Sequence, residues 1–209
     1  MAGLQVVKDV KQIIVGLFGG IASGKSAFAE ILRHKNAYII NADTVYKDLI
    51  KEGGQLKKLQ AEFSDCFDCG ALNWSRLREQ TFNCTKKLEL LNSITHPPII
   101  TRIKELIAKS TAETIVLEIP LPNVAKELES FYDITVCVIS SLDRRMERIL
   151  QRGIDKKTAQ KIIAVQVLDE DLIKQCDYAV YNDGDLADLK EKAEEFFKTI
   201  LNAKGKKDC

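Results

Sequence analysis

The segment Gly19–Ser26, with the sequence GGIASGKS, constrains the fold of this chain more than any other feature. It matches G-x-x-x-x-G-K-[ST], a loop whose backbone N–H groups surround phosphate oxygens. The apolar run 13–17 before it predicts a buried parallel strand, and residues 25–33 after it predict a helix. This order predicts a phosphate-binding α/β fold, because the helix N-terminus adds partial positive charge to the loop. An ordinary glycine-rich turn is the alternative.

Two side chains at the end of this loop have expected chemical roles. Lys25 is predicted to place its charge at the β- and γ-phosphates of a nucleotide, and the Ser26 hydroxyl is a candidate ligand for Mg²⁺. No N-K-x-D motif for reading guanine occurs in the sequence, which argues against a GTPase.

The composition is that of an ordinary globular protein. The chain has 209 residues, of which 45% are hydrophobic and 29% are charged, and its net charge is +1. This balance does not indicate nucleic-acid binding or an acidic membrane surface, and no apolar stretch approaches the ~20 residues that span a bilayer. The first twelve residues do not resemble a signal peptide. We therefore expect a cytoplasmic protein with no nucleic-acid or membrane partner.

The cysteines allow a second, weaker hypothesis. Cys66 and Cys69 form a C-x-x-C pair, with Cys84 and His96 further along the chain. Zinc binding by these four residues is conceivable. No second C-x-x-C follows and the intervening segments look helical, so free thiols are the favoured interpretation.

Short β-rich runs alternate with longer amphipathic stretches along the chain. This alternation predicts a parallel α/β sheet with right-handed crossovers. Together with the phosphate loop and the two stretches described below, it predicts a P-loop NTPase fold, a three-layer α/β/α parallel sheet with a helical substrate-binding insertion and a helical lid. The expected strands are 13–17, 37–40, 114–119, 133–139 and 178–181. The expected helices are 25–33, 43–51, 54–63, 74–81, 84–109 with an interruption at Pro97-Pro98, 123–130, 142–152, 156–166 and 186–201.

Two stretches do not fit a minimal strand–helix–strand unit, the first because of its length and the second because of its many basic residues. About seventy residues separate the second and third expected strands, where a crossover needs only a dozen or two. The second stretch carries seven Lys and Arg residues within 141–172 and predicts a helical hairpin over phosphates. We therefore expect a core formed by 1–43, 113–141 and 173–209, a helical substrate-binding domain over 44–112 and a lid over 142–172.

Asp43 directly follows the second expected strand, and ligands of open α/β sheets bind beyond the carboxyl ends of strands. A carboxylate there can accept the proton of a substrate hydroxyl. The alternative is that Asp43 caps the helix that begins near Thr44. His96 precedes Pro97 and is predicted to lie at a helix kink, either contacting a substrate or as a surface or kink-capping residue.

Arg148 and Arg152 are four residues apart and share one helix face. Guanidinium groups suit phosphate contacts, although a solvated face paired with Asp143 and Glu147 is the alternative. Asn182 follows the last expected strand, and its local sequence predicts a turn. The position after a core strand would let this turn pack beside a nucleotide base, but a turn alone is the favoured alternative.

Taken together, these segments resemble the dephospho-coenzyme A kinase family over about residues 13–200. The alanine–aspartate, asparagine–histidine–proline and asparagine–glycine elements in this order are more specific than the phosphate loop. The matching segments are 16–26, 41–43, 91–97, 119–121, 148–152, Gln166 and 177–184.

The resemblance implies ATP-dependent phosphorylation of the ribose 3′-hydroxyl of dephospho-CoA, giving CoA and ADP, by a monomer or weak homo-oligomer that uses Mg²⁺ on Ser26. It implies catalytic roles for Asp43, Lys25 and Arg148. The implied substrate-binding residues are Asp43, Lys47, His96, Pro97 and Pro120. The implied ATP-binding residues are Gly20, Ile21, Ala22, Ser23, Gly24, Lys25, Ser26, Ala27, Arg152 and Asn182.

Several positions depart from the family pattern. The usual Asp-Ala-Asp begins with Asn41 here, Lys47 stands where an Arg is usual, and Ile162 replaces a lid arginine expected four residues before Gln166. The usual Pro-Leu-Leu-Phe-Glu is reduced to residues 120–124, PLPNV. Two alternatives therefore remain: a kinase of the same fold acting on another nucleotide or nucleoside, and a non-catalytic nucleotide-binding protein.

Overall fold

The computed structural model describes residues 12–82, 84–119, 127–164, 166 and 168–206. The chain divides into two compact units, the first formed by 1–39, 110–120 and 129–209 and the second by 40–109 and 121–128. The first unit includes the basic segment 142–172 together with the sheet. The predicted division into core, substrate domain and lid stays a prediction.

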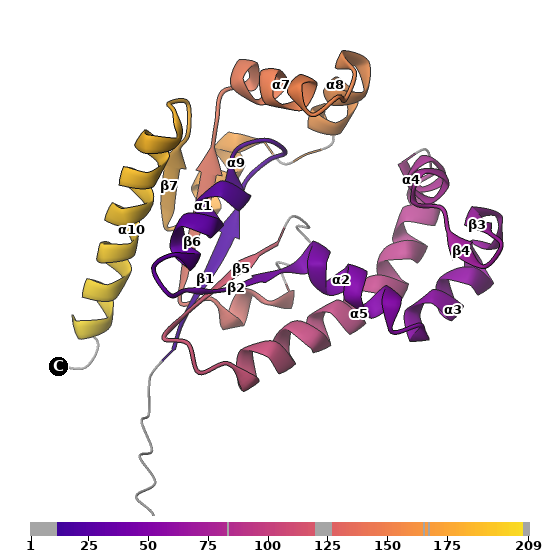
Figure 1. Cartoon of the computed structure of the whole chain (residues 1–209), viewed down its shortest axis with the longest axis horizontal. Coiled ribbons are helices and arrows are strands. Elements are labelled where there is room, and N and C mark those ends of the chain that lie inside the picture. Colours follow the sequence, from indigo (N-terminus) through magenta and orange to yellow (C-terminus); the bar gives the residue numbers. More distant parts are fainter. Residues whose placement is uncertain (1–11, 83, 120–126, 165, 167, 207–209) are drawn as a thin grey trace, which may run out of the picture. The chain divides into compact units, whose positions relative to one another are not determined.

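A five-stranded sheet with the order β2-β5-β1-β6-β7 organises the first unit (Figure 1). Its strands are β1 (Ile13–Phe18), β2 (Tyr38–Asn41), β5 (Thr114–Glu118), β6 (Ile134–Ile139) and β7 (Tyr178–Tyr181). β1 pairs in parallel with β5 and β6, and β6 pairs in parallel with β7. Each of these parallel neighbours requires a crossover, so the α/β class is confirmed.

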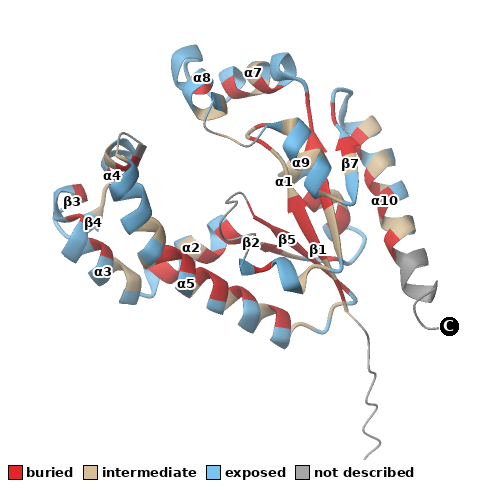
Figure 2. Ribbon diagram, turned by 180° about the vertical axis from the view of Figure 1, so that it is seen from behind, coloured by how far each residue is buried: buried red, intermediate tan, exposed pale blue. Residues whose placement is uncertain are grey.

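The core of the first unit lies between the sheet and two helices, α1 (Lys25–Arg33) and α10 (Leu186–Lys206). Figure 2 shows the buried residues concentrated on the central strands and along one side of α10. Phe28 of α1 and Phe196 of α10 pack with their ring centroids 5.6 Å apart. Burying large aromatic side chains of this kind contributes roughly 1.5–3 kcal/mol each and fixes α1, which starts at the phosphate loop.

Three further helices complete the described part of the first unit. α7 (Leu142–Gln151) and α8 (Lys156–Ala164) form the predicted basic hairpin, and α9 (Asp169–Gln175) follows. α9 was not predicted, because its seven residues are too short for a clear apolar period. Its first turn contains Asp169, Glu170 and Asp171, which favour a helix N-terminus through the helix dipole.

The second unit is built from α2 (Ala42–Lys51), α3 (Gly54–Glu62), α4 (Trp74–Phe82) and α5 (Thr85–Lys109). A small cluster joins them, formed by the buried residues Ile50, Leu59, Phe63, Cys66 and Leu77. Between α3 and α4 the chain makes a 3₁₀ turn and a two-stranded antiparallel hairpin, β3 (Phe67–Asp68) and β4 (Ala71–Leu72). The sequence did not predict this hairpin, because two-residue strands carry no alternating pattern.

The predicted interruption at Pro97-Pro98 is wrong, since α5 includes both prolines. Its apolar residues continue with helical spacing past the prolines, and Ile99, Ile100 and Ile103 are buried. Figure 1 shows the ribbon changing direction partway along α5, as expected where prolines remove backbone donors. Burial of the apolar face thus outweighs the two missing hydrogen bonds.

The other predicted elements agree with the structure to within one or two residues, except that α10 extends to Lys206. Residues 123–126 of the helix predicted over 123–130 lie outside the described residues. A 3₁₀ turn, Glu129–Phe131, occupies the described end of this segment.

Candidate active site

The phosphate loop joins β1 to α1 through a strained backbone that only glycine accommodates at two points. Gly19 has φ 144° and Gly24 has φ 105°. A Cβ at Gly24 would lie 2.1 Å from Asn182 Nδ2, and one at Gly19 would lie 2.4 Å from the Val138 carbonyl oxygen. Ala22 also has a positive φ, 58°, which is uncommon for a residue other than glycine.

Lys25, the first residue of α1, folds back over this loop. Its Nζ donates hydrogen bonds to the carbonyl oxygens of Gly19 at 2.7 Å and Gly20 at 3.2 Å. The ammonium group is therefore kept at the centre of the loop, where the motif requires a positive charge for phosphate binding.

Ser26 meets an acidic residue that the sequence analysis did not single out. Its Oγ donates to Glu118 Oε1 at 2.7 Å, and Glu118, the last residue of β5, is only 5% exposed. A hydroxyl and a carboxylate oxygen side by side are hard oxygen ligands, and Mg²⁺ at phosphate sites uses only one or two carboxylates. The residues therefore fit Mg²⁺. Among the described residues, no three His, Cys, Asp or Glu side chains gather as a metal cluster.

Asn182 attaches the end of β7 to the phosphate loop. Its side chain is 4% exposed and donates from Nδ2 to the Ser23 carbonyl at 2.7 Å, while its backbone N–H donates to Ile139. Asp183, the next residue, accepts hydrogen bonds from Ser140 Oγ and the Ser141 N–H. These bonds hold the pKa of the Asp183 carboxyl below its usual range. The predicted turn thus fixes the loop as well as ending a strand.

Arg148 and Arg152 occupy different environments. Arg148 Nη1 donates to the Ala22 carbonyl and to Ser140 Oγ, each at 3.2 Å, and Nη2 donates to the Asn182 carbonyl at 3.0 Å. Arg152 follows the last residue of α7 and is exposed. Arg148 therefore contacts the backbone of the loop directly.

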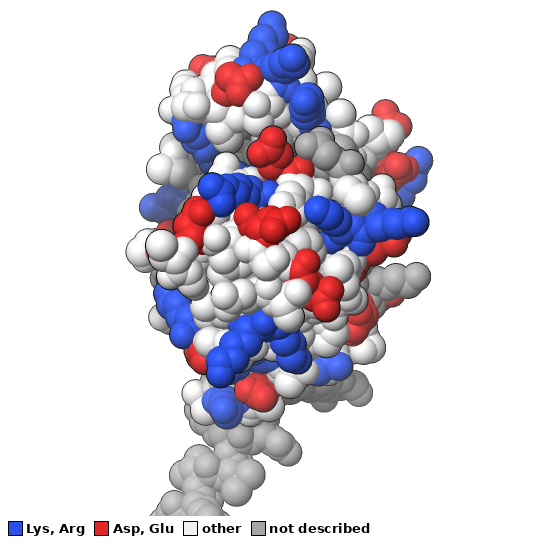
Figure 3. Space-filling view, turned by 90° about the vertical axis from the view of Figure 1, so that its right-hand side faces the viewer, with Lys and Arg blue, Asp and Glu red and all other residues white. Residues whose placement is uncertain are grey.

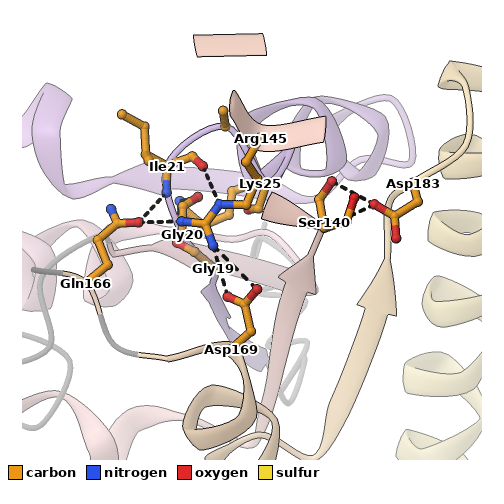
Figure 4. Close-up of polar contacts among 12 residues, drawn as sticks. Gly19, Gly20, Ile21, Lys25, Ser140, Arg145, Gln166, Asp169 and Asp183 are labelled. Atoms are coloured by element: carbon orange, nitrogen blue, oxygen red, sulfur yellow. Dashed lines mark hydrogen bonds and ion pairs between the residues drawn. The ribbon is translucent and has the colours of Figure 1, made fainter. Parts of the chain in front are cut away.

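Arg145, one turn before Arg148 on α7, forms a second set of contacts with the loop (Figure 4). Its guanidinium lies between the Ile21 carbonyl, Gln166 and Asp169. Arg145 belongs to the basic segment and Gln166 to the family pattern described above, but the sequence alone does not show that the two residues meet. Their partners become visible only once α7 and the 166–169 segment are folded against the loop.

On the second unit, Asp43 lies in the first turn of α2 and is exposed. The capping alternative for Asp43 is wrong, because Asn41 is the N-cap and its Oδ1 accepts from the Thr44 N–H at 3.0 Å. Asn41 therefore caps α2, as an aspartate at this position also could, and capping does not account for Asp43. Lys47, one turn further along α2, is exposed.

His96 lies in α5 directly before the two prolines and is buried, with 7% exposed, so the surface alternative is wrong. Its Nε2 has no hydrogen-bond partner among the described residues. Burial lowers the pKa of His96, and the nearby Glu127 carboxylate opposes this in part. Pro97 follows in the same helix, and Pro120 lies outside the described residues.

The candidate zinc residues do not share one environment. Cys66 is buried, whereas Cys69, in the hairpin turn, is exposed. Free thiols are recorded at Cys66, Cys69 and Cys84. Burial raises the pKa of the Cys66 thiol, which disfavours the thiolate that zinc binding requires.

Glu118 is the main site residue that the sequence analysis missed. A signal was present, because an acidic residue ends the apolar run Thr114–Leu117. The carboxyl end of a buried strand is where ligands of α/β sheets bind. A carboxylate at the end of a buried strand, together with the serine of the phosphate loop, indicates a metal site more strongly than either residue alone.

The parallel sheet, the glycine-rich loop between β1 and α1, and the Ser26–Glu118 pair define a P-loop nucleotide-binding protein of the kinase type. A family model described as dephospho-CoA kinase matches residues 13–188. The chain belongs to this family.

Individual relatives agree with this assignment. A dephospho-CoA kinase of Fusobacterium nucleatum subsp. nucleatum is 35% identical over 195 residues, covering 90% of this chain and 98% of that protein. The crystal structure of TT1252 from Thermus thermophilus matches with a TM-score of 0.80 and 26% identity, covering 92% of this chain and 97% of that one. A dephospho-CoA kinase from Campylobacter jejuni has the same fold, with a TM-score of 0.66, 24% identity and coverage of 91% and 98%.

Proposed function

We propose that this chain transfers the γ-phosphoryl group of ATP to the ribose 3′-hydroxyl of dephospho-CoA, giving CoA and ADP. The observation that carries this proposal is the match of the dephospho-CoA kinase family over residues 13–188, because the phosphate loop alone is common to many kinases. The site described above supplies the parts that phosphoryl transfer needs, which are mainly positioning and neutralisation of charge.

On the nucleotide side, the loop backbone from Gly20 to Ala27 binds the phosphates and Lys25 neutralises charge on the transferring group. The contacts of Lys25 with Gly19 and Gly20 support this role, because they keep its charge at the loop. Arg148 holds the Ala22 and Asn182 carbonyls, and the exposed Arg152 adds positive charge at the phosphates. Asn182 orients the loop beside the nucleotide base.

Ser26 and Glu118 are the residues that would hold Mg²⁺. The 2.7 Å contact between Ser26 Oγ and the buried Glu118 carboxylate supports this. When bound, Mg²⁺ neutralises charge on the phosphate oxygens. Ser26 and Glu118 would thus serve the phosphate site by holding this ion, because a carboxylate by itself repels phosphate oxygens.

On the acceptor side, Asp43 orients the ribose hydroxyl and accepts its proton. Its place in the first turn of α2, with Asn41 as the cap, supports this role. Lys47, His96, Pro97 and Pro120 bind the dephospho-CoA. The buried Nε2 of His96 supports a polar contact there, because a buried polar atom without a partner costs free energy that a ligand can recover.

The remaining expectations concern partners and location. Figure 3 shows Lys and Arg interspersed with Asp and Glu on the face it presents, a mixture that does not favour a nucleic-acid surface. No described helix is long and apolar enough to cross a membrane. A monomer or weak homo-oligomer in the cytoplasm remains our prediction.

The test is an acceptor panel with purified protein, ATP and Mg²⁺. We expect ADP and CoA to form in equal amounts with dephospho-CoA, and AMP or nucleosides to give little product. A strong preference for AMP or a nucleoside would show that this acceptor, and not dephospho-CoA, is the substrate. Binding of ATP without transfer to any acceptor would indicate a non-catalytic nucleotide-binding protein.

A further inference from the structure

Arg145 is buried to a degree that is unusual for an arginine, with a side chain only 3% exposed. A buried guanidinium is tolerated only where its charge and its donors find partners. Nε donates to the Ile21 carbonyl at 3.0 Å, Nη2 donates to Gln166 Oε1 at 2.7 Å, and Nη1 lies 3.2 Å from Asp169 Oδ1. These partners come from the phosphate loop and from the 166–169 segment.

These contacts fix both backbone polar groups of Ile21, in the middle of the phosphate loop (Figure 4). Its carbonyl accepts from Arg145, and its N–H donates to Gln166 Oε1 at 2.9 Å. One oxygen of Gln166 therefore bridges the loop backbone and the guanidinium. The loop peptide at Ile21 has little freedom to rotate while this pair is intact.

The guanidinium also lies directly against Gly20. A Cβ at Gly20 would be 2.3 Å from Nη2 and 2.6 Å from Cζ of Arg145. The loop is thus packed against the plane of the arginine as well as hydrogen-bonded to it. This close approach explains why glycine is needed at position 20.

We propose that Arg145 is a positioning residue for nucleotide binding, which acts by fixing the Gly20–Ile21 part of the phosphate loop together with Gln166. This inference rests on the proposed function only in taking the loop as the nucleotide site. Asp169 pairs with the guanidinium, so Arg145 acts through the shape of the loop and not as a free charge for phosphate. Removing it leaves the phosphate-binding N–H groups present but no longer aligned.

The first test compares the binding of ADP and AMP by calorimetry in the wild type and in Arg145→Gln. The loop surrounds the β-phosphate, which AMP lacks. We expect ADP affinity to fall by about tenfold or more and AMP affinity by less than about threefold, because hydrogen bonds to a charged group are lost at the β-phosphate site. An equal loss for both nucleotides, or no loss for either, would overturn the proposal.

Arg144→Gln is the matched control. Arg144 is the preceding residue on α7, loses the same charge on substitution and is half exposed. Among the described residues its ion-pair partner is the surface residue Glu147, at 3.3 Å. Its substitution is expected to leave ADP affinity unchanged. A loss equal to that of Arg145→Gln would mean that general charge, and not the contacts with the loop, is responsible, which contradicts the proposal.

Gln166→Met separates positioning from direct phosphate contact, and it serves in place of Arg145→Gln if that variant does not fold. Methionine has nearly the same length but cannot accept the hydrogen bonds from Ile21 and Arg145. We expect a loss of ADP selectivity over AMP, and a double variant that loses no more than Arg145→Gln alone, because the two residues act as one unit. Unchanged ADP affinity in Gln166→Met would contradict the proposal.

These binding measurements remain informative if the chain does not phosphorylate dephospho-CoA, because they need only ADP and AMP. If it does, we expect Arg145→Gln to raise the KM for ATP and leave the KM for dephospho-CoA unchanged. A rise in both constants would indicate general damage to the fold and contradict a positioning role. Failure of the kinase reaction with normal ADP selectivity would overturn the proposed function alone.

Discussion

The phosphate loop of the first unit and the helical second unit differ in how they satisfy their buried polar atoms. Around the loop, Arg145, Arg148 and Asn182 each contact backbone carbonyls, and Ser23 Oγ is the loop's buried side-chain atom without a partner among the described residues. In the second unit, Tyr46 Oη, Gln55 Oε1 and His96 Nε2 are buried without partners in the described part of the chain. Outside the loop, the described part of the first unit has one such atom, Tyr132 Oη. Burial raises the pKa of Tyr46 to about 12, so its hydroxyl stays protonated at neutral pH.

This difference suggests a division of work between the two units. The phosphate loop is preorganised, since its backbone is fixed by side chains from α7, the 166–169 segment and the end of β7. Preorganised donors stabilise developing charge without reorganisation during the reaction. Unpartnered polar atoms in the second unit cost free energy, which a polar substrate can recover by contacting them. We therefore expect changes in the first unit to affect nucleotide binding most, and changes in the second unit to affect the acceptor.

Within the first unit, the largest effect is expected from Lys25→Met, which removes the positive charge at the centre of the loop. We expect kcat to fall about 10²–10³-fold, the loss typical of removing one donor to a transition state. Steady-state kinetics with saturating ATP would measure it. A variant with near-normal kcat would show that Lys25 serves only the structure of the loop.

A pair of glycines tests whether rigidity is concentrated at the loop. Gly24 and Gly53 both precede helices with positive φ, 105° and 83°, but only Gly24 has a neighbour that an added Cβ would meet. We expect Gly24→Ala to cost about 3 kcal/mol or more, from strain and from collision with Asn182.

Gly53→Ala is the matched control. It should cost only the about 1–2 kcal/mol of the backbone conformation. Denaturant unfolding of both variants would measure the difference. Equal losses would contradict the idea that the loop is the more tightly packed of the two regions.

Glu118→Gln tests the metal site. The amide preserves size but removes the carboxylate that accepts from Ser26 at 2.7 Å. We expect the Mg²⁺ concentration for half-maximal activity to rise about 10–100-fold, as for other residues that support a metal site. A Mg²⁺ titration at fixed ATP would show it, and an unchanged titration would exclude Glu118 from metal binding.

The smallest effect concerns acid stability of the second unit. Burial lowers the pKa of His96 below its ordinary 6.5, so the unfolded chain binds a proton more readily than the folded one. Its contribution to stability is present above about pH 6.5 and is lost as the pH falls through the folded pKa. His96→Gln should weaken the fall in Tm on acidification between pH 7 and 5. An unchanged slope would show that other groups dominate.

Sequence analysis predicted the phosphate loop well because its chemistry is local. The motif, the apolar run before it and the helix after it are contiguous, so one segment specifies the strand–loop–helix geometry. The parallel sheet was also predictable, since β5 and β6 are buried apolar runs that carry their own signal.

The rest depended on contacts between distant residues. Glu118 lies 92 positions from Ser26, and Arg145 lies 124 positions from Ile21, so no local pattern could pair them. The helix α5 continues through Pro97 because its apolar face is buried. Local helix propensity does not indicate how strongly a face is buried, so this continuation could not be predicted. The short hairpin β3–β4 and α9 were too brief to show a period.

The most direct test of the account is Asp43→Asn, because it separates the two units within one experiment. We would measure ADP affinity by calorimetry, and CoA formation from ATP and dephospho-CoA by mass-resolved chromatography. The account predicts ADP affinity equal to the wild type and CoA formation lower by about 10²–10⁴-fold, the usual contribution of a general base. CoA formation close to the wild-type rate would contradict the assignment of acceptor chemistry to Asp43.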